Sequence, residues 1–352
     1  MKKLGLALLL VVVLACLGGF VVYSRVNESY RGYSGESQDV VIAPGTSPRA
    51  IGDSLVASGV VRDTLTYRVA LALSGAARHL KAGEFRFDRP ITPRDVIDKI
   101  ARGEFDLVNM TFREGLTIAE MAALFEAQGF GTAASFRTAA GDVALVADVD
   151  PAARDLEGYL FPDTYPVSRH IDAPQMVQIM VERFLRVLTP DLRAAAQAKG
   201  LTVRQLVTLA SIVEKETGSP AERPLVAAVY SNRLRIGMGL QCDPTVIYAL
   251  QRAGKYNGNL RRDDLSFDSP YNTYRYGGLP PGPIAAPGRE SLEAAAHPDD
   301  SDYIFFVSKN DGTHAFARSL EEHNRNVQTY QVQYFKDKRL AAERAGATPT
   351  ER

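Results

Sequence analysis

The chain of 352 residues lacks tryptophan and contains only two cysteines, Cys16 and Cys242. Cys16 lies inside an apolar N-terminal run, so the pair predicts neither an intrachain disulfide nor a cysteine-based zinc site. The five histidines form no H-E-x-x-H pair, which argues against a zinc protease. From these absences we expect neither a metal ion nor a cofactor.

Several common catalytic and binding signatures are also missing. The sequence has no G-x-S-x-G nucleophile motif and no phosphate-binding loop with a Walker lysine. The net charge is zero at pH 7, which argues against a nucleic-acid-binding protein that works by bulk electrostatics. The apolar and charged fractions, 45% and 23%, are typical of a globular protein, and the length indicates two or three domains.

A long apolar run stands near the N-terminus, where Leu4–Tyr23 carries no charge. About twenty such residues span a bilayer as a helix, and Lys2 and Lys3 before the run predict a cytoplasmic N-terminus. A cleaved signal peptide is the main alternative, since the segment ending at Cys16 loosely resembles a lipoprotein signal. Because the apolar run continues past Cys16, we favour one uncleaved transmembrane helix in residues 1–25, with the rest of the chain outside the cytoplasm.

After a linker at 26–39 that is rich in Ser, Gly and Tyr, the chain alternates short strands, turns and helices. We expect strands at 40–43, 84–87 and 108–112, and helices at 51–59, 93–103 and 121–129. One turn and helix repeats downstream at a common spacing: Gly45, Ile51, Leu55 and Gly59 correspond to Gly115, Met121, Phe125 and Gly129. The pattern is typical of a small α+β module, which we place at 40–108.

The rest of the chain predicts mainly helices, with one long loop and a final hairpin. Helices are expected within 132–155, at 176–188 and 191–199, after Thr202, and at 220–236 and 320–338, with a compact aromatic loop at 155–165. The loop 261–288 is rich in Pro, Gly, Asn and Tyr, and a loop of that length is usually functional. Strands at 303–307 and 312–316 predict the hairpin. We therefore expect a larger α+β domain at 109–338, followed by a polar tail at 339–352.

Two glutamates, Glu214 and Glu216, stand near the end of the apolar helix expected after Thr202. A carboxyl group in apolar surroundings has a raised pKa and can serve as a general acid near neutral pH. On a helical wheel both glutamates flank the apolar face at similar angles, so periodicity does not choose between them. They are also too far apart around the helix to act as the carboxylate pair of a glycoside hydrolase. The alternative is that either glutamate forms an ion pair with a nearby Arg or Lys.

The loop Ser269–Ile284 places several aromatic residues and prolines beside Asn272 and Thr273. Such a surface suits a carbohydrate, because sugars stack their apolar faces on flat side chains and form hydrogen bonds with amides and hydroxyls. An ordinary ordered loop is the alternative. His314 and Cys242 are expected to be structural residues, the first near the end of a strand and the second in the core.

Six ordered motifs resemble those of one known family. They are LEGYLFPDTY at 156–165, LASIVEKET at 209–217, ER at 222–223 with VYSNRLRIGM at 229–238, LQCDPTVIY at 240–248, YNTY at 271–274 with GLPPG at 278–282, and His314 with His323 and Asn324. Together they resemble the MltG (YceG-like) endolytic murein transglycosylases, from the apolar N-terminal run to about residue 335.

The resemblance implies a single-pass inner-membrane enzyme that cuts the glycan strands of nascent peptidoglycan internally, with peptidoglycan synthases as partners. It implies a LysM-like module at 40–108 and a periplasmic, YceG-like catalytic domain at 109–338. In that family the second glutamate of the E-K-E-T motif is catalytic, and this residue is Glu216 here. Cys242 stands where the family pattern often has Thr or another small residue.

The resemblance also implies a mechanism with a single carboxyl group. Glu216 would protonate the oxygen between N-acetylmuramic acid and N-acetylglucosamine, and would then take the proton of the muramoyl C6 hydroxyl as that hydroxyl attacks the anomeric carbon. We expect the groove to be lined by Glu157, Gln241, Tyr271, Asn272, Thr273 and Tyr274. The alternatives are a non-catalytic peptidoglycan-binding anchor and a glycoside hydrolase with Asp163 as its second carboxylate.

Overall fold

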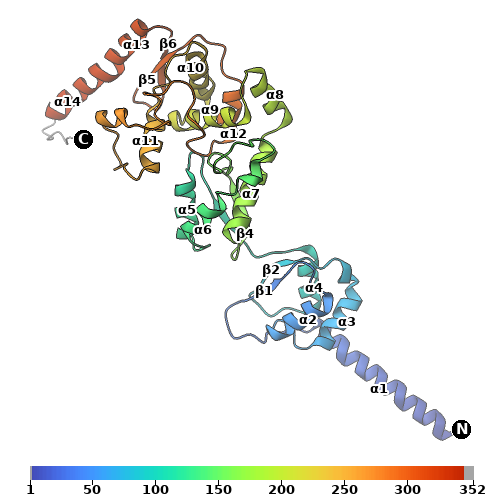
Figure 1. Ribbon diagram of the computed structural model, residues 1–352. Helices are drawn as coiled ribbons and strands as arrows, with labels where there is room; N and C mark the ends of the chain where they lie inside the picture. The colour runs from blue at the N-terminus through green and yellow to red at the C-terminus, as the bar shows by residue number, and fades with distance from the viewer. Residues whose placement is uncertain (1, 345–352) are drawn as a thin grey trace. The chain divides into compact units, whose positions relative to one another are not determined.

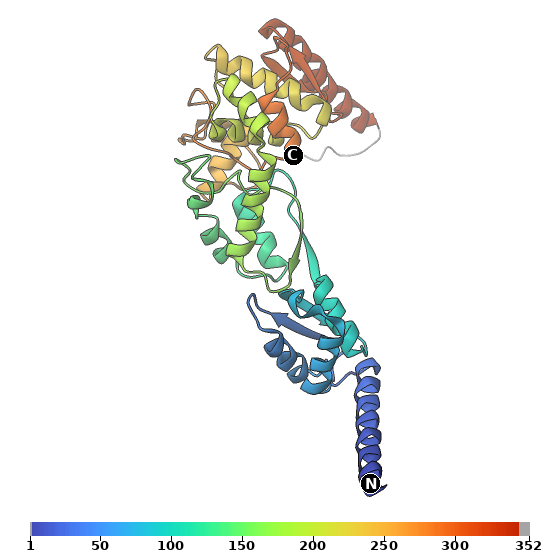
Figure 2. The ribbon, with the colours of Figure 1, turned by 90° about the vertical axis from the view of Figure 1, so that its right-hand side faces the viewer.

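The structure is a computed structural model that describes residues 2–344, apart from the side chains of residues 2–8, 11, 15 and 341–344. Figure 1 shows the chain as a ribbon coloured by residue number, and Figure 2 shows it from a second side. Two compact units are present. One comprises the residues up to Met110 together with Tyr165–His170, and the other comprises Thr111–Thr164 and the residues from Ile171 onward. Both contain helices and strands, which confirms the α+β class.

The first unit begins with a single long helix, α1 (Lys2–Asn27), which contains the apolar run. Its described apolar side chains are largely exposed, for example Leu14 at 61% and Phe20 at 71%. Among the residues that the structure describes, no helix is long and apolar enough to cross a membrane. The transmembrane segment at 1–25 therefore stays a prediction.

The core of the first unit lies between a two-stranded antiparallel sheet and three helices. Strand β1 (Gln38–Ile42) pairs with β2 (Gly83–Phe87), and the helices are α2 (Pro48–Ala57), α3 (Thr64–Ser74) and α4 (Pro93–Arg102), with the short 3-10 helix η1 (Ala76–Arg78). The side chains of Ser47, Asp63 and Thr92 accept hydrogen bonds from the first turns of α2, α3 and α4. The strands expected at 40–43 and 84–87 and the helix at 93–103 are confirmed, whereas α3 was not expected.

The chain returns to the first unit through a strand that the sequence did not predict. Strand β4 (Thr164–Ser168) pairs with β3 (Leu107–Thr111), where β3 confirms the strand expected at 108–112. The expected aromatic loop therefore ends in a strand at Thr164. The alternating burial of β4 contributes Tyr165 and Val167 to the interior.

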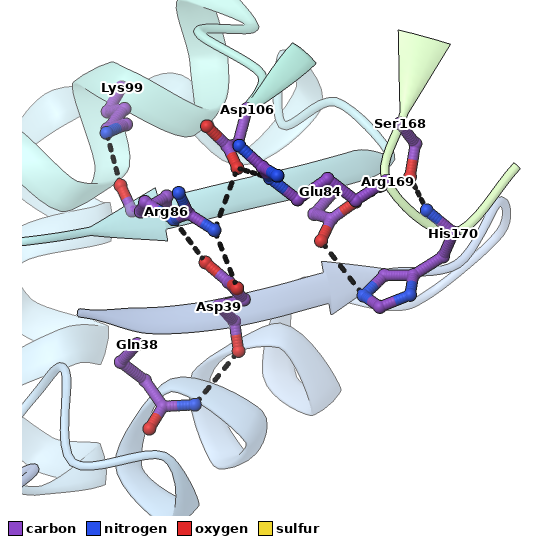
Figure 3. Close-up of polar contacts among 9 residues, drawn as sticks. All are labelled: Gln38, Asp39, Glu84, Arg86, Lys99, Asp106, Ser168, Arg169 and His170. Atoms are coloured by element: carbon purple, nitrogen blue, oxygen red, sulfur yellow. Dashed lines mark hydrogen bonds and ion pairs between the residues drawn. The ribbon is translucent and has the colours of Figure 1, made fainter. Parts of the chain in front are cut away.

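Ion pairs connect this returning segment to the first sheet, as Figure 3 shows. The guanidinium of Arg86 lies 2.9 Å from Asp39 Oδ1 and 3.3 Å from Asp106 Oδ2. The buried carboxylate of Glu84 lies 3.1 Å from Nε2 of His170, which follows β4. The two sheets of this unit are thus joined by these side-chain contacts and by a backbone hydrogen bond of 2.9 Å from the N–H of Asp106 to the carbonyl of Glu84.

The second unit is mainly helical. Its elements are α5 (Ile118–Ala127), α6 (Ala133–Ala139), η2 (Val143–Val146), α7 (Ala173–Val187), α8 (Pro190–Ala198), α9 (Val203–Glu216), η3 (Pro220–Glu222), α10 (Arg223–Arg235), α11 (Asp243–Arg252), η4 (Arg262–Ser266), α12 (Arg289–Ala296), β5 (Phe305–Ser308), β6 (His314–Ala317), α13 (Leu320–Val327), the π-helical segment η5 (Gln328–Gln333) and α14 (Tyr334–Arg344). The expected hairpin is confirmed, since β5 and β6 pair antiparallel. The helix expected at 320–338 is interrupted by η5, and residues 345–352 of the expected tail lie outside the described part.

Helix α9 is the buried centre of this unit. Thr202 and Gln205 form a reciprocal capping box at its start, which confirms the helix expected after Thr202. Its apolar side chains from Leu206 to Val213 are fully buried, and α9 packs against α10 and α12. The helix ends at Glu216, so its packing fixes the position of that residue.

The close packing of α2 on α3 generates a stability prediction. A Cβ atom added at Gly52 would lie 2.3 Å from the ring of Tyr67, which is buried at 1% exposure. We expect Gly52→Ala to lower the free energy of unfolding by about 1–3 kcal/mol, measured by chemical denaturation. The control Asp53→Ala replaces an exposed neighbour on the same helix. It should change the free energy of unfolding by less than about 0.5 kcal/mol. Equal effects of the two substitutions would contradict this packing.

Candidate active site

The carboxyl group of Glu216 is enclosed by side chains from two other helices. The hydroxyl of Tyr230, on α10, donates a hydrogen bond of 2.6 Å to Glu216 Oε1. The side chain of Cys242, which precedes α11, also lies near this carboxyl and acts on its pKa. Tyr230 and Cys242 are fully buried, whereas Glu216 itself is half-buried. The carboxyl group of Glu216 is therefore held among buried groups at the end of a helix whose last residue is partly exposed.

Burial raises the pKa of Glu216 above its ordinary value of 4.5. The hydrogen bond from Tyr230 and the side chain of Cys242 act in the opposite direction, as does His314, whereas the negative charge of Asp243 raises the pKa further. Because desolvation is the largest effect, the group holds its proton more firmly than an exposed glutamate. This is the property that a general acid needs near neutral pH.

Glu214 has different partners from Glu216. Its Oε2 accepts a hydrogen bond of 2.9 Å from the backbone N–H of Gly288, and its Oε1 lies 3.3 Å from the guanidinium of the buried Arg223. Arg223 also pairs with Glu114 and Glu290. The sequence alone allowed either glutamate to form an ion pair, and the structure shows this pair at Glu214. Both carboxylate oxygens of Glu214 have partners within the fold.

Two further polar residues considered from the sequence are also held by internal contacts. Nδ1 of His314 lies 2.7 Å from Glu222 Oε2, and the backbone N–H of His314 donates to Glu222 Oε1 at 2.8 Å. The carboxylate of Asp163 lies 2.7 Å from Nε of Arg183. His314 is therefore held by hydrogen bonds with Glu222, and Asp163 by an ion pair with Arg183.

Asn272 and Thr273 point into the loop rather than away from it. The side-chain amide of Asn272, fully buried, donates to the carbonyls of Leu265 and Phe267 at 2.9 and 2.8 Å. The hydroxyl of Thr273 accepts a hydrogen bond of 3.0 Å from the backbone N–H of Cys242. These contacts position the loop beside Cys242, and a direct contact of either side chain with substrate stays a prediction.

Gln241 and Tyr274 lie next to the Glu216 site and face solvent. The hydroxyl of Tyr274 donates a hydrogen bond of 2.6 Å to Asp243 Oδ1. Gln241 is exposed and has a φ of 49°, a left-handed conformation that is uncommon for a residue with a side chain. The backbone N–H of Gln241 donates to the carbonyl of Thr273 at 3.2 Å, so the two segments are joined there. Of the expected groove residues, these two are placed beside the candidate acid.

Tyr271 and Glu157 belong to a second group. The ring of Tyr271 packs edge-on against Tyr248 at 5.0 Å, and the hydroxyl of Tyr248 donates to Glu157 Oε2 at 3.0 Å. Both expected groove residues, together with Arg252, line a cavity of about 70 Å³. Glu157 also accepts a hydrogen bond of 3.0 Å from the backbone N–H of Ile118, at the start of α5. Glu157 therefore connects α5 with α11 through its hydrogen bonds, and Tyr248 of α11 in turn contacts Tyr271 of the loop 269–284.

Three residues of the site were not selected from the sequence. Tyr230 and Asp243 lie inside the motifs that carry the family resemblance, but no periodicity or spacing relates them to Glu216. Arg233 is buried and donates to the carbonyls of Ile304 and Leu240 at 2.7 and 2.6 Å. Among the described residues, no group of three or more His, Cys, Asp or Glu side chains could hold a metal ion.

The buried Glu157 generates a prediction about stability and pH. Desolvation raises its pKa from 4.5 to about 8, so the folded state prefers the protonated form. Stability should fall as pH rises from about 4.5 to about 8, by at most about 1.4 kcal/mol per unit. Glu157→Gln, which is neutral at every pH, should flatten this decline in thermal melting curves. The exposed control Glu293→Gln should leave the decline unchanged, and a Glu157→Gln curve parallel to the wild type would contradict the assignment.

Comparisons with known proteins agree on one family. The sequence model of the YceG-like family matches residues 40–329. A Bacillus subtilis protein named endolytic murein transglycosylase is 30% identical over 89% of this chain and 91% of its own length. The protein of the same name from Streptococcus pneumoniae strain D39 is 29% identical over 93% of this chain, which spans 65% of that protein. A solved YceG-like structure from Listeria monocytogenes is 30% identical, covers 83% of this chain and 99% of its own, and superimposes with a TM-score of 0.56. The chain belongs to the YceG-like family.

Proposed function

We propose that this protein is an endolytic murein transglycosylase, a lyase that cleaves peptidoglycan glycan strands internally. The bond cleaved is the one between N-acetylmuramic acid and N-acetylglucosamine, and the product carries a 1,6-anhydro end that terminates strand elongation. The proposal is supported by similarity to relatives that bear this name. The observation that carries it is the carboxyl group of Glu216, buried on one side, with a raised pKa and a hydrogen bond from Tyr230.

In the first step, the protonated Glu216 donates its proton to the glycosidic oxygen, and the bond from the anomeric carbon to that oxygen breaks. Desolvation favours the protonated form before the reaction, and the hydroxyl of Tyr230 stabilises the carboxylate that forms after it. In the second step, the C6 hydroxyl of the same muramoyl sugar attacks the anomeric carbon and gives its proton to Glu216. The enzyme returns to its starting state without consuming water.

A single acid–base group is sufficient because the substrate supplies its own nucleophile. A hydrolase with Asp163 as a second carboxylate is the alternative, and it would release a reducing end. The pairing of Asp163 with Arg183 at 2.7 Å makes Asp163 a weaker candidate for that role. A non-catalytic peptidoglycan-binding anchor is the other alternative, and it predicts that Glu216→Gln leaves the cellular function of the protein intact.

The groove residues belong to the same proposal. Gln241 and Tyr274 face solvent beside Glu216, and both can contact the sugar rings. Asn272 and Thr273 contribute by holding the loop, through their contacts with Phe267 and Cys242. Tyr271 and Glu157 contribute at the neighbouring cavity, farther along the loop.

We also infer a location at the inner membrane, with the apolar run at Leu4–Tyr23 as the anchor and both compact units in the periplasm. The exposed apolar side chains of α1, such as Leu14 and Phe20, would then face lipid. In this proposal the segment 40–108 is a LysM-like module near the membrane, and peptidoglycan synthases are partners.

The proposed division of roles between the two glutamates can be tested by two substitutions. Glu216→Gln should lower the release of anhydro-muropeptides from purified glycan strands by at least about 100-fold, because general acid–base catalysis is lost. Its stability should be retained, because an amide is cheaper to bury than a carboxyl group. Glu214→Gln should retain activity but lose about 1–3 kcal/mol of stability, because Arg223 loses a charged partner.

Product analysis separates the alternatives in the same experiment. Normal formation of anhydro ends by Glu216→Gln would rule out its catalytic role. Reducing ends in place of anhydro ends would identify a hydrolase. A wild-type protein that binds glycan but releases no fragments would identify the non-catalytic anchor.

The membrane location is tested by a charged substitution in α1. Leu14→Arg should move part of the full-length protein out of the detergent-extracted membrane fraction, because an arginine at the centre of a span costs about 2.5–3.5 kcal/mol. Leu65→Arg is a matched control, since Leu65 is exposed at 60% on α3 and Leu14 at 61% on α1. Wild-type protein recovered in the soluble fraction would refute the anchor.

A further inference from the structure

Asp243 is a neighbour of Glu216 that the single-carboxyl mechanism leaves without a role. It directly follows the buried Cys242, and its negative charge acts on the Glu216 carboxyl, so the two carboxyl groups lie near each other. The side chain of Asp243 is exposed, whereas Cys242 is fully buried. Asp243 therefore presents its carboxyl group to solvent beside the buried Cys242.

The orientation of Asp243 is fixed by the loop. The hydroxyl of Tyr274, which is 37% exposed, donates a hydrogen bond of 2.6 Å to Asp243 Oδ1. The backbone of Cys242 is held in turn by its hydrogen bond of 3.0 Å to the hydroxyl of Thr273. A charged group that is already oriented in this way stabilises charge in a transition state without reorganising during the reaction.

A purely structural explanation for Asp243 is available but incomplete. Asp243 is the first residue of α11, and an acidic residue in the first turn of a helix stabilises it by about 0.3–1 kcal/mol. An uncharged residue there would spare the nearby Glu216 carboxyl the repulsion of a second negative charge. The structural explanation also does not account for the hydroxyl of Tyr274, which reaches Asp243 from another segment.

The other titratable and charged groups that act on Glu216 have hydrogen-bond or ion-pair partners within the fold or donate to Glu216 itself. They are Tyr230 and Arg233 of α10, Cys242, Tyr274 and His314. The guanidinium of Arg233 donates to the carbonyls of Ile304 and Leu240, and His314 pairs with Glu222. Asp243 is the member of this group that offers a negative charge toward solvent.

We propose that Asp243 is a second catalytic residue, an ionised carboxylate that stabilises the positive charge developing on the anomeric carbon and ring oxygen of the muramoyl sugar. Glu216 is neutral when the bond begins to break, so it supplies no negative charge at that moment. No bond to Asp243 forms. The proton still passes from Glu216 to the leaving oxygen, and the C6 hydroxyl returns a proton to Glu216. This inference rests on the proposed function.

The test compares Asp243→Asn with the wild-type protein on purified glycan strands. We expect kcat to fall about 100-fold, with KM within about threefold, because the lost charge acts mainly in the transition state. We also expect the basic limb of the pH profile to move to lower pH. Asp243 raises the pKa of Glu216, so its neutralisation lowers that pKa, and Glu216 loses its proton earlier as pH rises. The shift of this limb reports that the charge of Asp243 acts on Glu216, and the fall in kcat at unchanged KM separates a catalytic role from a structural one at the start of α11.

The loop offers a matched control. Asp268 also accepts a hydrogen bond from a tyrosine hydroxyl, that of Tyr276 at 2.7 Å, and is exposed. Asp268→Asn should leave kcat and the pH profile unchanged. Tyr274→Phe keeps the charge of Asp243 at the helix start but removes the hydrogen bond that orients its carboxylate, and it should lower kcat about tenfold. This variant serves as the test if Asp243→Asn does not fold.

The inference is overturned if folded Asp243→Asn lowers kcat no more than Asp268→Asn, or if the basic limb stays in place. It is also overturned if folded Tyr274→Phe has wild-type kcat. These results differ from a failure of the proposed function, in which the wild-type protein itself releases no anhydro ends.

Discussion

Partial burial of the Glu216 carboxyl is the constraint on which the candidate active site depends. A carboxyl group keeps its proton near neutral pH only if water is removed from it, yet it must reach a glycan. The chain meets both requirements by ending a buried helix at this residue. The apolar face of α9 fixes the backbone, Tyr230 and Cys242 lie against the carboxyl, and Glu216 as a whole residue is only half-buried.

The contrast between Glu214 and Glu216 follows from the partners that tertiary structure supplies. Glu214 lies beside the guanidinium of Arg223 and the backbone N–H of Gly288, which satisfy a carboxylate. Glu216 receives only neutral donors from its helix neighbours, and burial dominates its pKa. Two glutamates with similar angles on one helix thus have different partners. Helical periodicity reports only the angle, which is why it could not distinguish them.

Local patterns predicted local structure well. The strand at 84–87, the capped helix after Thr202 and the hairpin at the end of the chain follow from alternation, capping residues and turn residues. The site depended on contacts between distant segments, which no local pattern contains. Asn272 shows the limit, because a polar residue in a loop suggested contact with sugar, but its amide donates to the carbonyls of Leu265 and Phe267. Tyr230 shows the converse, because its apolar ring belongs to the core and its hydroxyl reaches Glu216.

The position of Glu216 at the end of α9, rather than at the start, adds to the effect of burial. The unpaired carbonyls in the last turn of a helix carry partial negative charge, which disfavours a carboxylate there by about 0.3–1 kcal/mol. At a helix start the same carboxyl would meet backbone N–H groups, which favour ionisation. Asp243 occupies such a start on α11. The end of α9 and the start of α11 therefore bring a carboxyl with a raised pKa near a second, exposed carboxyl, which is the arrangement that proton donation and cation stabilisation require of one site.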